Sequence, residues 1–174
     1  MNIFDFFAKL PEPIISERLI LRKFNSEDVD ILAHLANNKK IKKFRASLPH
    51  PYTKEHAIDF INNLACNKNE HAFAITLNGE FIGTMSLYEK KDKVELGYWL
   101  GEPFWGNGYA TEAVKTLIKT AKNTNICPPI HALVITANIA SINVLKKCGF
   151  NIIDERIDDC GVHKGIMVTF LKCK

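Results

Sequence analysis

A glycine-rich turn is the segment of this sequence whose residue types most clearly suggest chemistry. It reads Trp105-Gly106-Asn107-Gly108-Tyr109-Ala110-Thr111 and leads directly into a stretch with helical periodicity. Glycine permits a tight turn and lets a ligand approach the main chain closely. The first N–H groups of a helix lack partners within the helix and lie at the positive end of its dipole, so they attract anions. The turn is therefore predicted to bind a phosphate or pyrophosphate group.

Two common nucleotide-binding motifs also contain a glycine-rich turn, and both fit this sequence poorly. A P-loop would need Gly-Lys-Ser/Thr at the turn, whereas the first lysine after it is Lys115. A dinucleotide-binding fingerprint would need a third small residue where Thr111 stands and an early βαβ unit, but the turn follows a half of the chain rich in hairpin signals. A Gly-x-Gly can also simply connect a strand to a helix, and the turn by itself leaves that interpretation open.

Strands and helices that would position the turn can be predicted from residue patterns. The clearest hairpin signal is Asn78-Gly79 between two runs of alternating apolar residues. We expect strands at 19–24, 73–77, 81–88, 94–100, 131–137, 150–157 and 163–171. We expect helices from a cap at 25–28 to about Asn37, from Thr53 to about Ala65, from Gly108 to Lys122, and from Asn138 to Gly149.

The apolar stripes of the expected helices indicate which faces pack. In the second helix the stripe is Ala57, Phe60, Ile61, Leu64 and Ala65, at three-four spacing. In the helix after the turn it is Ala110, Val114, Leu117, Ile118 and Ala121. The segment 39–52 carries two prolines and is expected to be an irregular loop. A strand meander followed by alternating strands and helices indicates an α/β fold, a mixed sheet covered by helices.

Length and composition indicate one globular domain spanning residues 1–174. The chain is 47% hydrophobic and 24% charged, which is ordinary for a domain with a substantial core. No apolar run reaches the roughly 20 residues that would span a bilayer, and the start lacks a signal-peptide layout, so we expect a soluble cytoplasmic protein without membrane contact. The sequence leaves a homodimer open.

Cysteine spacing and charge argue against a metal site and against a nucleic-acid partner. The cysteines are odd in number, scattered and without a C-x-x-C pair, so we expect free thiols and no metal. They are Cys66, Cys127, Cys148, Cys160 and Cys173. The formal charge is only +4, and the basic run 39–45 lacks aromatic interleaving, so we predict no direct nucleic-acid binding and interpret the run as a solvated helix end, with binding of an acidic partner as the alternative.

Several strings, in order along the chain, together resemble the GNAT acetyltransferase superfamily. Gly108-Tyr109-Ala110 matches the second half of the family signature Gln/Arg-x-x-Gly-x-Gly/Ala, while Trp105 stands where Gln or Arg is usual. The strings most similar to the branch that acetylates ribosomal-protein N-termini are 18–22 (RLILR), 95–100 (ELGYWL), 104–113 (FWGNGYATEA), 138–141 (NIAS) and 147–150 (KCGF). The resemblance covers about residues 15–170. It implies a mostly antiparallel twisted sheet of about six to seven strands flanked by about four helices.

The resemblance also implies a cosubstrate and a set of site residues. Acetyl-CoA would bind residues 105–111, and its pantetheine arm would lie along the backbone of Tyr98, Trp99 and Leu100, a segment that this family splays from the neighbouring strand. Asn138 would hold the same arm, although the asparagine is also a plain helix cap. Ser141 would offer its hydroxyl to the departing sulfur. The tyrosine general acid of many family members corresponds to Leu145 here.

Glu95 is the candidate general base. Period-two alternation places it on the same strand face as Gly97 and Trp99, beside the acetyl site that the resemblance implies. An exposed carboxylate is a weak base, so it would act through an ordered water or by orienting the amine. The alternative is a solvated strand glutamate without a catalytic role.

The acceptor implied by this branch is the α-amine of a peptide or protein N-terminus. An α-amine is neutral in roughly a tenth of molecules at pH 7, whereas fewer than about one lysine amine in a thousand is neutral, so an α-amine demands less of the base. Small amines such as polyamines and aminoglycosides are the main alternative. A non-catalytic coenzyme A-binding module is the other, because Trp105 and Leu145 depart from the family pattern.

Overall fold

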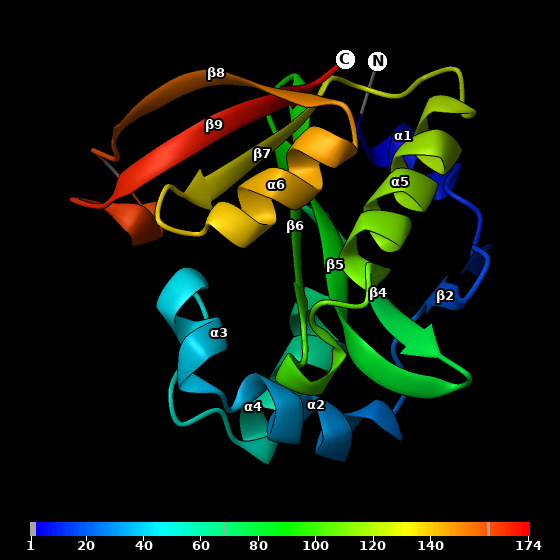
Figure 1. The fold of residues 1–174 in the computed structure, drawn as a ribbon. Helices are drawn as coiled ribbons and strands as arrows, with labels where there is room; N and C mark the ends of the chain where they lie inside the picture. Colours follow the sequence, from blue (N-terminus) through cyan, green and yellow to red (C-terminus); the bar gives the residue numbers. More distant parts are fainter. Residues whose placement is uncertain (1–2, 68, 160) are drawn as a thin grey trace.

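One twisted sheet runs through the molecule (Figure 1). The computed structural model describes residues 3–67, 69–159 and 161–174, and within them the sheet has nine strands. The strands are β1 (Ile14–Ile15), β2 (Leu19–Arg22), β3 (Cys66–Asn67), β4 (Glu70–Leu77), β5 (Glu80–Lys90), β6 (Lys93–Leu100), β7 (Ile130–Ile135), β8 (Phe150–Ile157) and β9 (Met167–Cys173). Their order is β1-β2-β4-β5-β6-β7-β9-β8, with β3 paired to β4. Only β6 and β7 run parallel among these described pairs.

The seven expected strands are all present, which confirms a mostly antiparallel mixed sheet. The two additional strands, β1 and β3, have two residues each, too few to show an alternating pattern. The last strand begins at Met167, later than expected, because Gly161–His163 forms a short 3-10 helix. Asn78 and Gly79 join β4 to β5 with φ angles of 51° and 87°, as the two-residue hairpin predicts.

Helices cover both faces of the sheet. They are α1 (Ile3–Ala8), α2 (Asp28–Ala36), α3 (Lys39–Phe44), α4 (Lys54–Asp59), α5 (Tyr109–Lys122) and α6 (Ile139–Lys147), with a π-helix at Phe60–Leu64 and a 3-10 helix at Glu102–Phe104. Residues of α1, α5 and α6 share one buried cluster with the sheet, and residues of α2, α3 and α4 share another. In Figure 1 the second group lies together at the lower end. No helix in the described part of the chain is both long and apolar enough to cross a bilayer.

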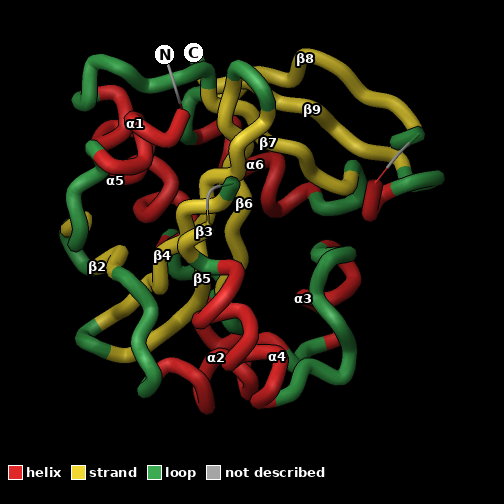
Figure 2. Tube along the Cα trace, turned by 180° about the vertical axis from the view of Figure 1, so that it is seen from behind, coloured by secondary structure: helices red, strands yellow, loops and turns green. Residues whose placement is uncertain are grey.

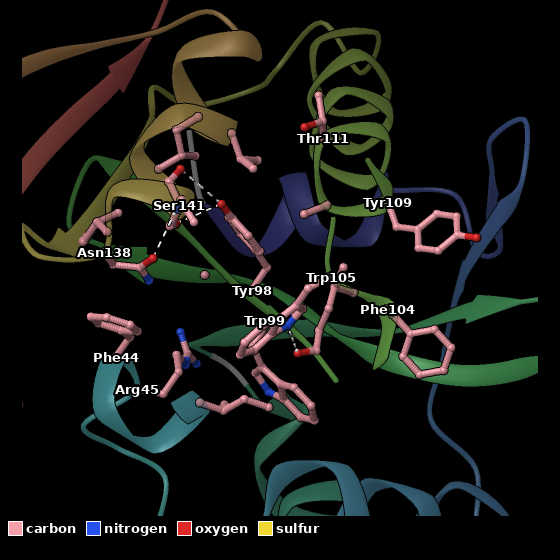
Figure 3. A pocket seen from close by; sticks show the side chains of 18 of the residues that line it. Phe44, Arg45, Tyr98, Trp99, Phe104, Trp105, Tyr109, Thr111, Asn138 and Ser141 are labelled. Carbon is pink, nitrogen blue, oxygen red and sulfur yellow. Dashed lines mark hydrogen bonds between the residues drawn. The ribbon is translucent and has the colours of Figure 1, made fainter. Parts of the chain in front are cut away.

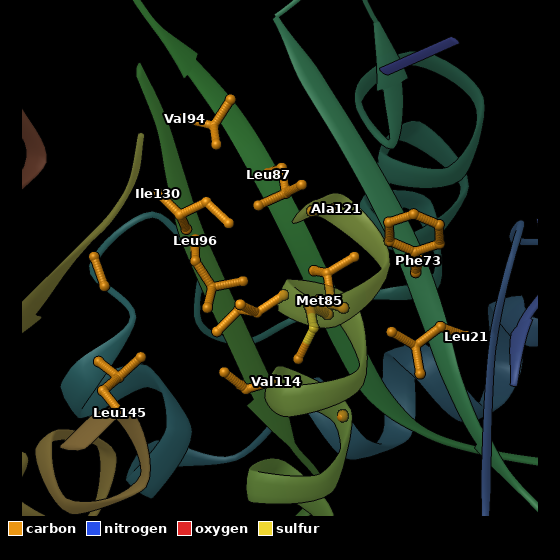
Figure 4. Packing of buried hydrophobic residues seen from close by; sticks show 14 of the residues in the cluster. Leu21, Phe73, Met85, Leu87, Val94, Leu96, Val114, Ala121, Ile130 and Leu145 are labelled. Carbon is orange, nitrogen blue, oxygen red and sulfur yellow. The ribbon is translucent and has the colours of Figure 1, made fainter. Parts of the chain in front are cut away.

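The larger cluster contains the buried stripe of α5 (Figure 4). Val114, Leu117, Ile118 and Ala121 are buried as predicted, packed against β6 residues such as Val94 and Leu96. Burying this stripe is the main force that holds α5, and the glycine turn before it, against the sheet. Cys127, Cys148 and Cys173 are free thiols, while Cys160 and the side chain of Cys66 lie outside the described residues.

Two helix predictions were wrong in detail. The segment 39–52 is not entirely irregular, because Asn38 caps α3 by accepting a hydrogen bond from the amide of Lys40 at 2.8 Å. Ile41 is its one buried residue and Phe44 is half-buried, and two apolar positions are too few to establish a helical period. In the second helix the stripe fails at Leu64, which is 44% exposed because the π-helix turns it away from the core.

The segment 25–28 leads into α2 as predicted, with Asn25 Oδ1 accepting a hydrogen bond from the amide of Glu27 at 3.0 Å and Asp28 accepting one from the amide of Asn25 at 2.9 Å. The helix begins at Asp28, and Glu27, its N-cap residue, makes no side-chain cap. The Asp28 side chain is buried and also accepts two hydrogen bonds from Arg22, at 2.7 and 2.8 Å. This bidentate pair ties the start of α2 to the end of β2.

Candidate functional site

A gap between β6 and β7 forms the centre of the site. In the described ladder these strands pair only at Val94 with Ile130 and Glu95 with His131, although β6 continues to Leu100. Figure 2 shows β7, β9 and β8 diverging from β6. The main-chain groups on this edge of β6, beyond Glu95, are therefore left without a neighbouring strand.

A cavity of about 490 Å³ fills this gap (Figure 3). Its lining joins the end of β6, the glycine turn, the first turn of α5, the inner face of α6 and the end of α3. Of the predicted site residues it includes Tyr98, Trp99, Leu100, Trp105, Gly106, Gly108, Tyr109, Ala110, Thr111, Asn138 and Ser141. Asn107 is not part of this lining, and its side-chain amide donates to the carbonyl of Trp105 at 3.0 Å.

The glycine turn has the geometry that an anion site needs. Gly106 and Gly108 have φ angles of 78° and 80°, in the left-handed region that favours glycine. Gly108 is the N-cap of α5 and makes no side-chain cap, so the first amides of the helix, at the rim of the cavity, have no capping acceptor, and the Arg18 guanidinium lies close to Gly108. A Cβ at Gly106 would meet nothing within 4 Å, so the surrounding space is open. A pyrophosphate fits this turn.

Trp105 braces the turn against β6. Its indole N–H donates to the carbonyl of Leu100 at 2.7 Å, while 43% of the residue remains exposed. The bond fixes the distance between the end of β6 and the start of the turn. Trp105 is thus both a wall of the cavity and a support for the backbone beside it.

Arg18 and Glu112 hold the other side of the turn. Glu112 accepts hydrogen bonds from Ser16 Oγ at 2.7 Å and from the amide and Nε of Arg18 at 2.8 and 2.7 Å. Burial raises the pKa of Glu112, but these hydrogen bonds outweigh it and the net shift is downward. Arg18 also donates to the carbonyl of Asn107 at 3.2 Å, which brings a cation beside the glycine turn. Only the string 18–22 pointed to Arg18, and it gave no reason for this contact.

Asn138 and Ser141 occupy the start of α6. The Asn138 side chain accepts a hydrogen bond from the amide of Ser141 at 3.2 Å, so the predicted helix cap is confirmed. Both residues also line the cavity. Leu145, one turn further along the helix, is fully buried and forms part of the apolar wall.

The side chain of Tyr98 is a functional group that the sequence did not reveal. Its hydroxyl lies 2.9 Å from the Ser141 hydroxyl and 3.3 Å from the Ser141 carbonyl oxygen. Burial raises the pKa of Tyr98 to about 12, against the lowering effect of the Ser141 hydrogen bond. Tyr98 therefore keeps its proton at neutral pH. The alternation of β6 could have suggested this contact, because Tyr98 faces the opposite way from Glu95.

Glu95 has the facing that alternation predicts. The register from β5 to β6 is unbroken from Lys93 to Leu100, so Glu95 shares a face with Gly97 and Trp99. The residue is half-buried and does not line this cavity. It does not line the second cavity either, which lies between the sheet and the helices α2 to α4. Its role as a base stays a prediction.

A second cavity, of about 310 Å³, lies between the sheet and the helices α2 to α4. Arg45 and Trp99 line both cavities, so they form the wall between them. Arg45 belongs to the basic run that the sequence suggested was solvated; Lys40 of the same run also lines the first cavity and forms an ion pair with Glu102. Among the described residues, no group of three or more His, Cys, Asp and Glu side chains is placed to hold a metal ion.

Comparison with known proteins gives a consistent result. Residues 18–151 match the family model described as an acetyltransferase (GNAT) domain. A protein of Bacillus licheniformis called uncharacterized N-acetyltransferase p20 is 32% identical over 149 residues, which cover 80% of this chain and 82% of the relative.

Solved structures with the same fold carry different names. The apo structure of RimL, a ribosomal L7/L12 alpha-N-protein acetyltransferase, superimposes with a TM-score of 0.79 at 20% identity and covers 92% of this chain and 93% of its own. A spermidine N-acetyltransferase from Vibrio cholerae, solved with CoA and spermine, gives a TM-score of 0.75 at 17% identity, with coverage of 89% and 94%. At these identities the likeness concerns the fold.

Proposed function

The chain belongs to the GNAT acetyltransferase family, and we propose that it transfers an acetyl group from acetyl-CoA to the α-amine of a protein or peptide N-terminus. The observation that carries the proposal is the gap between β6 and β7, closed at one end by the anion site at Gly106–Thr111. The choice of an α-amine rests on the chemistry of the acceptor.

The described residues fit acetyl-CoA. The amides at the start of α5 would hold the pyrophosphate, with Arg18 beside them. The free edge of β6 at residues 96–100 would hydrogen-bond the pantetheine arm as a neighbouring strand would. Asn138 would contact the same arm from α6. When bound, acetyl-CoA supplies a thioester whose carbonyl carbon accepts the amine.

Ser141 and Tyr98 would assist the departing sulfur. In the reaction the amine nitrogen bonds to the acetyl carbon, the carbon–sulfur bond breaks, the amine loses a proton and the sulfur keeps the electron pair. Ser141 can donate a hydrogen bond to that sulfur while its oxygen accepts a hydrogen bond from the Tyr98 hydroxyl, and the distance of 2.9 Å allows this. Glu95 would take the amine proton through a water.

The α-amine is the proposed acceptor on chemical grounds. Its low basicity leaves roughly a tenth of it neutral at pH 7, which suits a site where the proposed base is a carboxylate. A polyamine or an aminoglycoside is the second candidate, because the spermidine enzyme has the same fold. The formal net charge of this chain is +4, which disfavours the binding of such polycations.

Calorimetry and a thiol-release assay would test the proposal. Purified protein should bind coenzyme A, and it should release free thiol from acetyl-CoA when given a Ser-Ala or Ala-Arg peptide. Release with tobramycin or spermidine but not with the peptides would favour the second candidate. Tight binding without release to any acceptor would identify a non-catalytic module, and no binding at millimolar coenzyme would end the proposal.

A further inference from the structure

β8 forms one edge of the sheet. It pairs with β9 on one side, and no described strand lies on its other side. Both ribbon views place it at the outer margin of the molecule (Figure 1, Figure 2). The main-chain N–H and C=O groups on its outer side therefore have no strand partner, and such an edge can pair with another chain. The lining of the two cavities includes no residue of β8, so this edge is separate from the coenzyme site.

Apolar side chains are exposed along this edge. Ile152, Ile153 and Ile157 of β8 all reach solvent. Ile153 is the extra residue of a bulge, because the register with β9 shifts between Ile152 and Asp154. The connection to β9 and the first residue of that strand add three more exposed apolar side chains, Val162, Ile166 and Met167, and Met167 pairs directly with Ile157. Exposed apolar side chains that gather in this way mark a contact surface.

The sequence of β8 is complementary to itself when the strand is reversed. Residues 153–157 read Ile-Asp-Glu-Arg-Ile. Two copies of β8 can pair antiparallel around a two-fold axis at Glu155. Ile153 of one copy then lies opposite Ile157 of the other, and each such contact occurs twice. Asp154 lies opposite Arg156 in the same way. A second copy of this chain is thus the partner that the charges and the apolar positions of this edge fit.

The facing of the charged side chains agrees with this pairing. Asp154 and Arg156 are two positions apart beyond the bulge, so both point to one face of the sheet. They form an ion pair of 2.8 Å within the chain, and the Arg156 guanidinium lies over the Phe170 ring. Both side chains remain about half exposed, which leaves them accessible to a partner. The opposite copy extends the ion pair to a cluster of four charges of alternating sign.

Charged residues on an edge strand usually prevent pairing with another chain, because the approaching strand opposes or buries them. Within residues 153–157 this pairing leaves one like-charged contact, Glu155 with its own copy at the axis. The carboxylate of Glu155 accepts a hydrogen bond from Thr169 Oγ at 2.9 Å, which holds it toward its own sheet. Two contacts between opposite charges flank this single repulsive contact, so the charges favour pairing.

We propose that two copies of this chain form a dimer by antiparallel pairing of their β8 strands around Glu155. The two sheets join into one continuous sheet, and the exposed isoleucines of each copy cover those of the other. The pairing gives partners to the outer main-chain groups of both edges at once.

Sedimentation velocity tests the dimer. The wild-type protein should sediment at twice the mass of one chain at sub-millimolar concentration, and a protein that stays monomeric throughout this range would overturn the proposal. Asp154→Arg and Arg156→Asp each put like charges opposite one another at both contacts, so each should raise the dimer dissociation constant more than about tenfold. Asp30→Arg is the matched control, because it breaks an exposed ion pair of the same kind, with Lys54, far from β8 (Figure 1). It should leave the dissociation constant unchanged.

Mixing the two charge-reversal variants tests the register. Asp154→Arg leaves arginine at both positions and Arg156→Asp leaves aspartate at both, so neither variant keeps the ion pair within its own chain. In an equal mixture each arginine meets an aspartate of the other variant, and a heterodimer should form with about the wild-type dissociation constant. Folded variants that stay monomeric in the mixture, or that each dimerise alone as the wild type does, would exclude this pairing of β8.

Glu155→Gln tests the position of the axis by a gain of affinity. The variant removes the repulsive contact and keeps an oxygen that can accept from Thr169. It should lower the dimer dissociation constant severalfold, and an unchanged or raised constant would contradict an axis at Glu155. Thermal unfolding verifies that each variant is folded. Coenzyme calorimetry should give the wild-type affinity in all of them, because β8 lines neither cavity.

Discussion

The hydroxyl of Tyr98 lies 2.9 Å from the hydroxyl of Ser141, across the cavity between β6 and α6. Tyr98 comes from the strand that would carry the pantetheine arm, and Ser141 from the first turn of the helix that faces it. The pair brings a phenol to the region where many family members use a tyrosine from the helix, although Leu145 occupies that helix position here.

Tyr98→Phe should lower kcat by about three- to tenfold with little change in the KM for acetyl-CoA. The variant keeps the ring and removes only the hydrogen bond to Ser141, whose value is about 1 kcal/mol. Ser141→Ala should cost more, because it also removes the group nearest the sulfur. The double variant should be no slower than Ser141→Ala alone. Additive losses in steady-state kinetics would show that the two hydroxyls act separately.

Alkaline pH should destabilise the protein through its buried tyrosines. Burial raises the pKa of both Tyr98 and Tyr52 to about 12, whereas the unfolded value is about 10. The folded state therefore holds protons that the unfolded state releases, so the stabilisation is complete below pH 10 and is lost as the pH rises toward 12. Urea unfolding at several pH values measures how steeply the free energy of unfolding falls between pH 10 and pH 12. Tyr98→Phe and Tyr52→Phe should each flatten it, and equal slopes in wild type and both variants would contradict the prediction.

Trp105→Phe should raise the KM for acetyl-CoA about five- to tenfold. The phenyl ring can replace much of the wall, but the hydrogen bond from the indole to Leu100 is lost, and the turn is then less firmly held. Trp105→Gln restores an N–H donor of the kind usual at this position and should recover part of the affinity. Equal coenzyme affinities of Trp105→Phe and the wild type, by calorimetry, would show that the brace is unnecessary.

Asp28→Ala should destabilise the fold by about 3 kcal/mol. The change leaves the half-buried Arg22 without its bidentate partner, and breaking one side of a buried ion pair typically costs that amount. Asp30→Ala is the control, because its ion pair with Lys54 is exposed and should contribute less than about 1 kcal/mol. Denaturant unfolding compares the two. Similar losses of unfolding free energy in the two variants would contradict the prediction that the buried Asp28 pair stabilises the fold more than the exposed Asp30 pair.

Local patterns predicted much of this fold. Asn78-Gly79 specifies its hairpin because both residues tolerate positive φ, and the stripe of α5 specifies a buried helix face. The glycine turn was found because its chemistry lies in the main chain, so that residue type and position suffice. All of these are signals carried within about a dozen neighbouring residues.

What the sequence did not predict depends on contacts between distant segments. Arg45 stands in a run of lysines, and its place in the wall between two cavities follows from how α3 packs on β6. Glu70 gave no signal because the strand pattern around it is ordinary, and only the packing of the helices α2 and α4 beside the sheet shows that it lines the second cavity. Tyr98 and Ser141 are 43 residues apart, and although alternation gives the face of Tyr98, only the packing of α6 beside β6 brings the two hydroxyls together.

The shortness of the ladder between β6 and β7 affects more than binding. Two residue pairs are all that hydrogen-bond the described halves of the sheet at this seam, and packing by α5 and α6 supplies the remaining connection. A molecule lying in the seam would complete the sheet as an added strand. Amides of β7 and α6 should then exchange with deuterium more slowly once coenzyme is present. Bound coenzyme would therefore stabilise the second half of the sheet against local unfolding.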